Sequence, residues 1–105
     1  MKSFNTPIFD VKICVFDDLV KATEYCKKLG MEDDAGECKA WVFDGGGTVF
    51  MAFDKDQLSH GVLAHEAYHA ARAVTRHAGI RVHKEDEELH AYLLEYIANK
   101  CAALL

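Results

Sequence analysis

The stretch KAWVFDGGGTVFMAFD, residues 39–54, decides the fold predicted for this chain. Two runs rich in β-branched and aromatic residues, 39–43 and 48–53, flank a glycine-rich turn over residues 44–47, which predicts a β-hairpin. The second strand, TVFMAF, is apolar on both faces, so we expect other elements to cover both sides of the sheet. No helix follows the glycines directly and no lysine has P-loop spacing, which argues against a nucleotide-binding loop.

Upstream of the hairpin, the sequence predicts a strand followed by a helix. VKICVF (11–16) is a β-branched and aromatic run typical of a strand. Asp17 or Asp18 can then cap a helix over 19–29, in which the apolar residues share one face and the lysines lie outside. Gly30 follows as a stop signal. The apolar positions are Leu19, Ala22, Cys26 and Leu29.

Downstream of the hairpin, two longer helices are predicted. Ser59 can cap a helix that runs through about Ala78 and ends at Gly79. IRVHK (80–84) connects it to a last helix, which begins near Glu85 with an acidic first turn that suits the helix dipole. The predicted order is β-α-β-β-α-α. This is an α+β domain over residues 1–105, with a small sheet, a hairpin and three helices.

Composition and charge narrow the classes of function. The net charge is −5 and no basic stripe is visible, so nucleic acid is not expected as a partner. Half of the residues are hydrophobic, which is typical of a globular domain. No apolar run resembles a signal peptide or a membrane helix, and the four cysteines form no CxxC pair. We therefore expect a cytoplasmic protein with reduced thiols and no membrane partner.

The helix predicted over 59–78 contains the stretch LAHEAYHAAR (63–72), which carries the motif HExxH as His65, Glu66 and His69. Histidines four residues apart on a helix are separated by one turn and about 40°, so both can bind one metal ion. Glu66 lies about 100° from His65, where it can act as general base without being a ligand. At this composition, roughly 0.03 such motifs are expected by chance.

The histidines fall on the face opposite the predicted core. With His65 at 0°, the apolar residues of the helix gather near 180°, whereas His69, Arg72 and Arg76 lie within about 40° of His65. This placement favours a metal site. The competing interpretation is a solvated polar face without metal.

Two histidines are too few for a tight zinc site, so a third ligand is required. No histidine lies six positions after His69, so the last helix is the better source. Glu88 lies opposite the apolar stripe of that helix and is our first choice. Glu87 is the rival, because it lies nearer small residues where helices can approach closely. His90, His83 and water are the remaining alternatives.

These residues resemble the zincin metallopeptidases, specifically the gluzincin pattern of HExxH followed by a downstream glutamate. The chain is also similar to minimal zincin-like proteins of bacteria and phages, over about residues 39–98. The resemblance implies that His65, His69 and Glu88 hold Zn²⁺ and that Glu66 is the catalytic base. It implies that Tyr92, one turn beyond Glu88, orients a ligand histidine, and that a peptide or protein substrate lies extended along one hairpin strand.

One departure from the gluzincin pattern concerns the transition-state oxyanion. Larger gluzincins supply a histidine or tyrosine for it from a C-terminal subdomain, and this sequence has only 17 residues after Glu88. The candidates for this donor stay open at the level of the sequence. They are Tyr68, Tyr92, Tyr96, His83, His90 and Arg72.

Two other functions remain compatible with the sequence. In one, zinc only joins two helices of a non-catalytic binding or inhibitor module, for example one encoded by a phage. In the other, the protein is a metal-dependent hydrolase of a small molecule. A joining zinc should strongly raise the melting temperature, whereas a catalytic zinc should bind hydroxamates.

Overall fold

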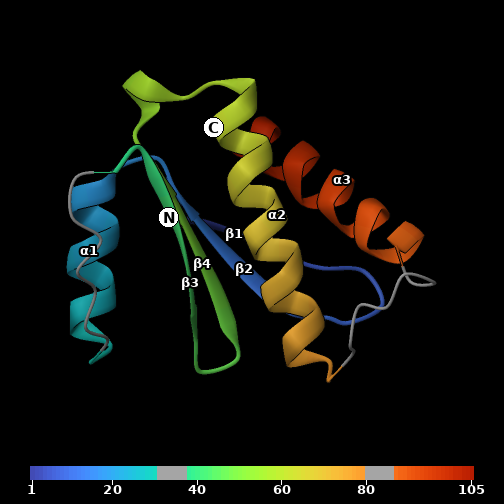
Figure 1. Ribbon diagram of the computed structural model, residues 1–105. Helices are drawn as coiled ribbons and strands as arrows, with labels where there is room; N and C mark the ends of the chain where they lie inside the picture. Colours follow the sequence, from blue (N-terminus) through green and yellow to red (C-terminus); the bar gives the residue numbers. More distant parts are fainter. Residues whose placement is uncertain (31–37, 80–86) are drawn as a thin grey trace.

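Helices cover both faces of a mixed β-sheet in the computed structural model, which describes residues 1–30, 38–79 and 87–105 (Figure 1). Within those ranges the chain forms four strands, three α-helices and a 3₁₀ turn. In chain order these are β1 (Lys2–Asn5), β2 (Lys12–Phe16), α1 (Leu19–Lys28), β3 (Ala40–Gly45), β4 (Thr48–Phe53), the 3₁₀ turn (Lys55–Gln57), α2 (His60–His77) and α3 (Glu87–Leu104). The predicted α+β fold is therefore confirmed, with α2 and α3 on one face and α1 on the other.

The described strands pair in the order β1-β2-β4-β3. β2 runs parallel to β4, whereas the β1–β2 and β3–β4 pairs are antiparallel. The predicted order lacks β1, because its sequence KSFN is short, has one apolar residue and contains no β-branched residue. β3 lies at one edge of the sheet, so its outer backbone has no strand partner among the described residues.

The hairpin turn is tighter than the predicted four-residue turn. Asp44 and Gly45 belong to β3 and pair with β4, so only Gly46 and Gly47 reverse the chain. Their φ angles are 62° and 86°. A two-residue hairpin turn of this kind needs positive φ at both positions, which glycine adopts without steric cost. The turn geometry therefore accounts for these glycines.

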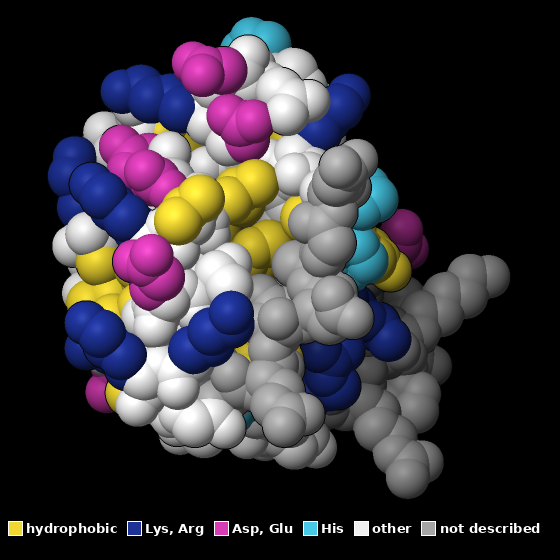
Figure 2. All heavy atoms as spheres, turned by 90° about the vertical axis from the view of Figure 1, so that its left-hand side faces the viewer, with side chains coloured by type: hydrophobic (Ala, Val, Ile, Leu, Met, Phe, Trp, Pro, Cys, Tyr) yellow, Lys and Arg dark blue, Asp and Glu magenta, His cyan; other side chains and the backbone are white. Residues whose placement is uncertain are grey.

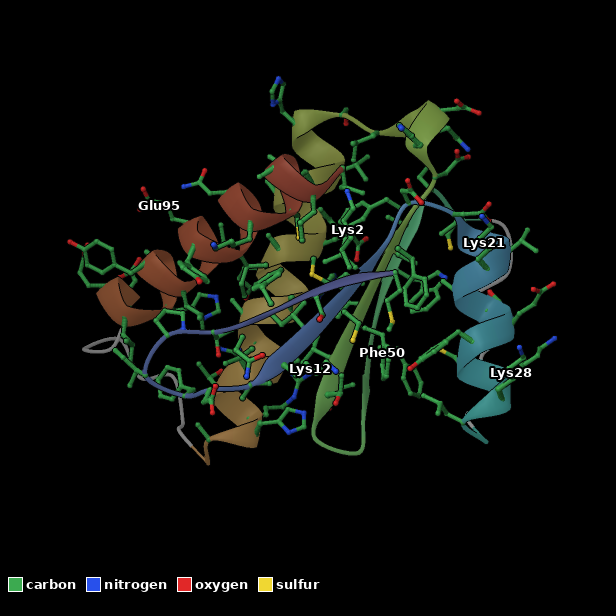
Figure 3. The ribbon with its side chains drawn as sticks, turned by 180° about the vertical axis from the view of Figure 1, so that it is seen from behind. Lys2, Lys12, Lys21, Lys28, Phe50 and Glu95 are labelled. Atoms are coloured by element: carbon green, nitrogen blue, oxygen red, sulfur yellow. The ribbon has the colours of Figure 1, made fainter. Side chains whose placement is uncertain are left out.

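β4 is covered on both faces, as its two-sided apolar pattern predicts. Val49, Met51 and Phe53 face the cluster that contains α2 and α3, whereas Phe50 faces the cluster that contains α1. Figure 3 shows Phe50 between the sheet and α1, where its ring centroid lies 6.1 Å from that of Tyr25. Burial of each large apolar side chain contributes about 1.5–3 kcal/mol relative to its exposure. β4 is thus one of the two interior strands against which both helical layers pack.

Side-chain caps begin α1 and α2 where the sequence predicts them. The Asp18 carboxylate accepts hydrogen bonds from two backbone N–H groups at the start of α1. The Ser59 hydroxyl accepts one from the N–H of Val62 at 3.1 Å. Gly30 and Gly79 follow the two helices in left-handed conformation, as the stop signals predict. The bounds of the helix that carries HExxH are therefore set by local sequence.

α3 folds back along α2 (Figure 1). The two helices share one apolar cluster, to which α2 contributes small residues such as Ala67 and Ala71. The buried residues of α3 are Leu93, Ile97 and Cys101. The predicted helix start at Glu85 and the connection 80–84 lie outside the described residues. No described helix is long and apolar enough to cross a membrane.

The cysteines pack mainly as small apolar side chains. Cys14, Cys26 and Cys101 are buried, whereas Cys38 is half-buried. Burial raises the pKa of the Cys101 thiol to about 12, because a thiolate loses its hydration there. Cys101 is therefore protonated at neutral pH. It packs in the core between α3 and β4, where its sulfur lies 3.7 Å from that of Met51.

Replacing Ser59 with alanine should lower the free energy of unfolding by about 1 kcal/mol, because the N–H of Val62 loses its acceptor at the start of α2. Urea unfolding followed by circular dichroism measures this difference. Ser59→Asp keeps an acceptor and adds negative charge at the positive end of the helix dipole, so it should retain the stability. An equal loss in both variants would contradict the capping role.

Candidate metal centre

His65 and His69 project from the exposed side of α2, opposite the residues that face the sheet. Their Nε2 atoms lie 3.2 Å apart and their ring centroids 4.8 Å apart. On the other side of the helix, Ala67, Ala70 and Val74 are completely buried. The predicted orientation of the helix is therefore confirmed, and the two rings meet at one place outside the core.

The separation of the two nitrogens fits a shared metal ion. Zinc–nitrogen bonds of about 2.0–2.1 Å in tetrahedral geometry place two imidazole nitrogens about 3.3 Å apart. A hydrogen bond between one protonated and one bare ring nitrogen suits the observed distance as well. In either state the helix holds both nitrogens where two metal ligands have to be, so little reorganisation is needed for binding.

Glu66 is a buried carboxyl group beside the histidine pair. Only 8% of the residue is exposed, and no hydrogen bond or ion pair joins it to another described residue. Burial raises the pKa of the Glu66 carboxyl group, and the nearby His65 and His69 offset part of this shift when they are protonated. A carboxyl group with a raised pKa and without a fixed partner is suited to exchange protons with a substrate or with water.

A groove runs between α2 and the edge strand β3, and Glu66 lines both of its halves. One hollow of about 350 Å³ contains Glu66 and His69, and the other, of about 380 Å³, contains Glu66 and His65. The first is completed by Trp41, Val42, Asp44, Ala73 and Arg76, and the second by Lys39, Ala40, Gly61 and Val62. The three residues of the motif thus line the middle of a groove whose other wall is a strand edge.

Histidine and basic side chains lie next to one another on this side of the molecule. Figure 2 shows them along the right-hand margin of the face in view, in cyan and dark blue. On α2, Arg72 and Arg76 continue the helix face of His65 and His69 toward the C-terminal end. The sequence predicts this face, and Arg76 does reach the groove.

The third ligand is less clearly placed than the first two. Among the described residues, no group of three or more His, Cys, Asp or Glu side chains is positioned to hold a metal ion. Glu87 and Glu88 are both exposed in the first turn of α3. The structure therefore brings His65 and His69 together without placing either Glu88 or His90 beside them as a third ligand, and Glu88 stays a prediction.

The helix face that carries Glu88 points away from α2. Glu88 lies about 140–180° around α3 from the buried residues Leu93, Ile97 and Cys101. Glu95 lies on the same face as Glu88, and Figure 3 shows it projecting outward from α3. A ligand from this helix is therefore better placed on its buried side.

His90 occupies that buried side, in contact with α2. Its ring centroid lies 5.3 Å from that of Tyr68, which in turn lies 5.9 Å from that of His69. Both His90 ring nitrogens are shielded from solvent without a hydrogen-bond partner in the described chain. Burial lowers the pKa of His90, and Arg72 lowers it further. A buried neutral imidazole with two unsatisfied nitrogens is destabilising unless an ion or a water molecule binds there.

The sequence names His90 only as an alternative to Glu88. The spacing from His90 to Leu93 and Ile97 places all three on one helix face, and this was the available signal. It is weak, because a histidine on an apolar face is commonly a core residue. The exposed polar strip that contains Glu88 resembles the lining of a cleft, which makes Glu88 the first choice from sequence.

Tyr92 lies in a different hollow from the histidine pair. It is 66% exposed and lines a groove of about 410 Å³ between α3 and residues 7–9. Its predicted role in orienting a ligand histidine therefore gains no support from its position, and it stays a prediction. Tyr96 contacts the ring of Phe4 and donates a long hydrogen bond to a backbone carbonyl of β1. Among the described candidates for the donor to the oxyanion, Tyr68 is the tyrosine whose ring lies next to that of His69.

A side-chain contact that the sequence analysis did not predict joins β3 to the end of α2. The Nε2 atom of His77 contacts a carboxylate oxygen of Asp44. The residues are 33 positions apart, so no local pattern could reveal the pair. The contact engages the acidic side chain of the groove lining.

Two facing imidazoles, a buried carboxyl group and a groove along a strand edge thus occur together on one side of the sheet. No protein-family model matches the chain, and the comparisons with curated proteins and solved structures gave no match. The function proposed below therefore depends on the geometry of α2, β3 and α3.

Proposed function

We propose that this protein is a zinc-dependent hydrolase that cleaves a peptide bond. One observation carries the proposal: two imidazole nitrogens 3.2 Å apart adjoin a buried glutamate in a groove beside an edge strand. The histidines would hold Zn²⁺ together with a third ligand from α3. Glu88 is the ligand that the sequence predicts, whereas the contacts of α3 favour His90.

Glu66 would act as the general base. When bound, the zinc ion supplies a Lewis acid that lowers the pKa of an adjoining water molecule. Glu66 would accept a proton from this water during attack on the carbonyl carbon and then deliver it to the leaving amine. Burial raises the pKa of the Glu66 carboxyl group, which makes the carboxylate a stronger base for the first of these steps.

The substrate would lie along β3 as an added strand. The outer N–H and C=O groups of an edge strand can pair with an extended peptide, which gives affinity independent of sequence. Ala40, Val42 and Asp44 alternate along β3 on the side that lines the groove. Tyr68, whose ring lies next to that of His69, would stabilise the oxyanion. Arg72, another of the candidates for this role, lies on the helix face of His65 and His69.

Metal content and metal-dependent cleavage test the proposal together. Protein purified without a histidine tag should contain about one equivalent of zinc by elemental analysis, and it should cleave members of a fluorogenic peptide library. A chelator should abolish cleavage and added zinc should restore it. Less than a tenth of an equivalent of metal, with no uptake on adding zinc, would refute the metal site. Cleavage that survives full metal removal would refute the mechanism.

A second candidate is a binding module in which zinc joins two helices without catalysis. The unsatisfied nitrogens of His90 favour it, because a ligand from the α2–α3 interface would connect the two helices. Such a zinc should strongly raise the melting temperature and leave no open position for a hydroxamate. Tight hydroxamate binding to the zinc-loaded protein would exclude this alternative.

A further inference from the structure

The two halves of the groove between α2 and β3 differ in chemistry. The half beyond His69 ends at Asp44 and Arg76, whereas the half beyond His65 is lined mainly by the small or apolar residues Ala40, Gly61 and Val62. Asp44 is engaged by His77. Arg76 is exposed and forms no ion pair with another described residue. The guanidinium group of Arg76 is therefore available to an anion that enters this half.

Arg76 stands at a fixed distance from the proposed reaction centre. It follows His69 by seven residues, which places it roughly 10 Å further along α2 at about 1.5 Å per residue. A peptide extended along β3 advances about 3.3 Å per residue. The substrate side chain that reaches Arg76 therefore lies roughly three residues from the bond that is cleaved.

The charge around the groove favours a negatively charged group at this position. The chain as a whole carries a net charge of −5, yet Arg72 and Arg76 continue the face of the two histidines on α2. Two arginines on one helix face of an acidic protein attract anions to that face rather than to the rest of the surface. The planar guanidinium group of arginine can bind a carboxylate through two parallel hydrogen bonds.

We propose that Arg76 selects substrates with a carboxylate roughly three residues from the cleaved bond, on the side of His69. This carboxylate is either an acidic side chain or the C-terminus of a short peptide. The inference rests on the proposed function, because it refers to a peptide bond that is cleaved. The carboxylate site itself depends only on the groove and on Arg76.

Binding to a zinc-loaded Glu66→Gln variant tests the inference without turnover. The probes are fluorescent ten-residue peptides of alanine, valine and serine, blocked at both ends, with one glutamate or one glutamine three residues from the centre on either side. A third set carries a free C-terminal carboxylate and no glutamate. Fluorescence anisotropy should show binding at least tenfold tighter for peptides with the carboxylate. The internal and terminal carboxylates are compared directly, which identifies the source that Arg76 prefers.

A second substitution assigns the effect to Arg76. Arg76→Gln in the same background should remove the preference, so that glutamate and glutamine peptides bind equally. Lys21→Gln on α1 removes the same charge across the sheet (Figure 3) and should leave the preference intact. A preference that survives Arg76→Gln, equal binding of all peptides, or no binding of any peptide would overturn the inference. If the unmodified protein cleaves no peptide but the carboxylate preference depends on Arg76, the proposed hydrolase fails and the carboxylate site stands.

Discussion

Glu66→Gln should cleave peptides at least a hundredfold more slowly than the unmodified protein while binding zinc with similar affinity. Glutamine has nearly the same shape as glutamate, so the burial of the side chain and the positions of His65 and His69 should change little. It cannot accept a proton from water at neutral pH, and loss of a general base typically costs a factor of about 10²–10⁴. Initial rates on a fluorogenic peptide and zinc titrations against a chelating dye measure the two properties.

Glu24→Gln provides a matched control for this substitution. Glu24 is an exposed glutamate on α1, on the opposite face of the sheet from the groove. The change therefore alters net charge equally without touching the proposed site, and cleavage should stay within about twofold of the unmodified rate. Full activity in Glu66→Gln would show that another group takes the proton. Loss of zinc in Glu66→Gln would instead make Glu66 a ligand.

His90→Ala should weaken zinc binding by a hundredfold or more, which corresponds to about 3 kcal/mol. The reason is that His90, whose ring contacts Tyr68 of α2, would be the ligand that α3 contributes, and loss of a ligand costs at least as much as the loss of its supporting contacts. Glu87→Ala and Glu88→Ala should have small effects, because both residues are exposed. Zinc titrations of all three variants against the same dye provide the comparison.

The outcome of these titrations separates the structural inference from the prediction made from sequence. A large loss only in Glu88→Ala would place Glu88 in the site, and it would require α3 to rotate relative to the arrangement described. Since His90 packs against Tyr68, His90→Gln is a necessary second variant. It keeps more of the side-chain volume, so a similar loss of affinity in both variants would exclude a packing effect as the cause.

The fold was predictable where short-range patterns determine it. The glycine turn, the two-sided apolar strand β4 and the side-chain caps of α1 and α2 each depend on residues within a few positions of one another. β1 and the parallel pairing of β2 with β4 were missed for a different reason. β4 pairs with β2 from a distant part of the sequence. β1 pairs with the next strand, but nothing local in KSFN identifies it as a strand.

The same distinction applies to the candidate site. The relation of His65, Glu66 and His69 follows from the geometry of one helix, so the sequence alone is enough to predict it. The position of His90 depends on how α3 packs on α2, and the end of the groove depends on contact between α2 and β3. These are tertiary contacts, so helix periodicity alone could not show which residue of α3 contacts α2.

The parallel pairing of β2 with β4 also determines the order in which this protein can assemble. β1 and β2 alone form a two-stranded ribbon, which is at best marginally stable in water. The sheet gains its two interior strands, β2 and β4, only when β4 has been synthesised, since β4 joins β2 to β3. All four strands precede α2 along the chain, and α2 buries its apolar face on them. During synthesis, the histidine pair therefore emerges after the sheet that orients it, and a metal ion bound by this pair would be captured late in folding.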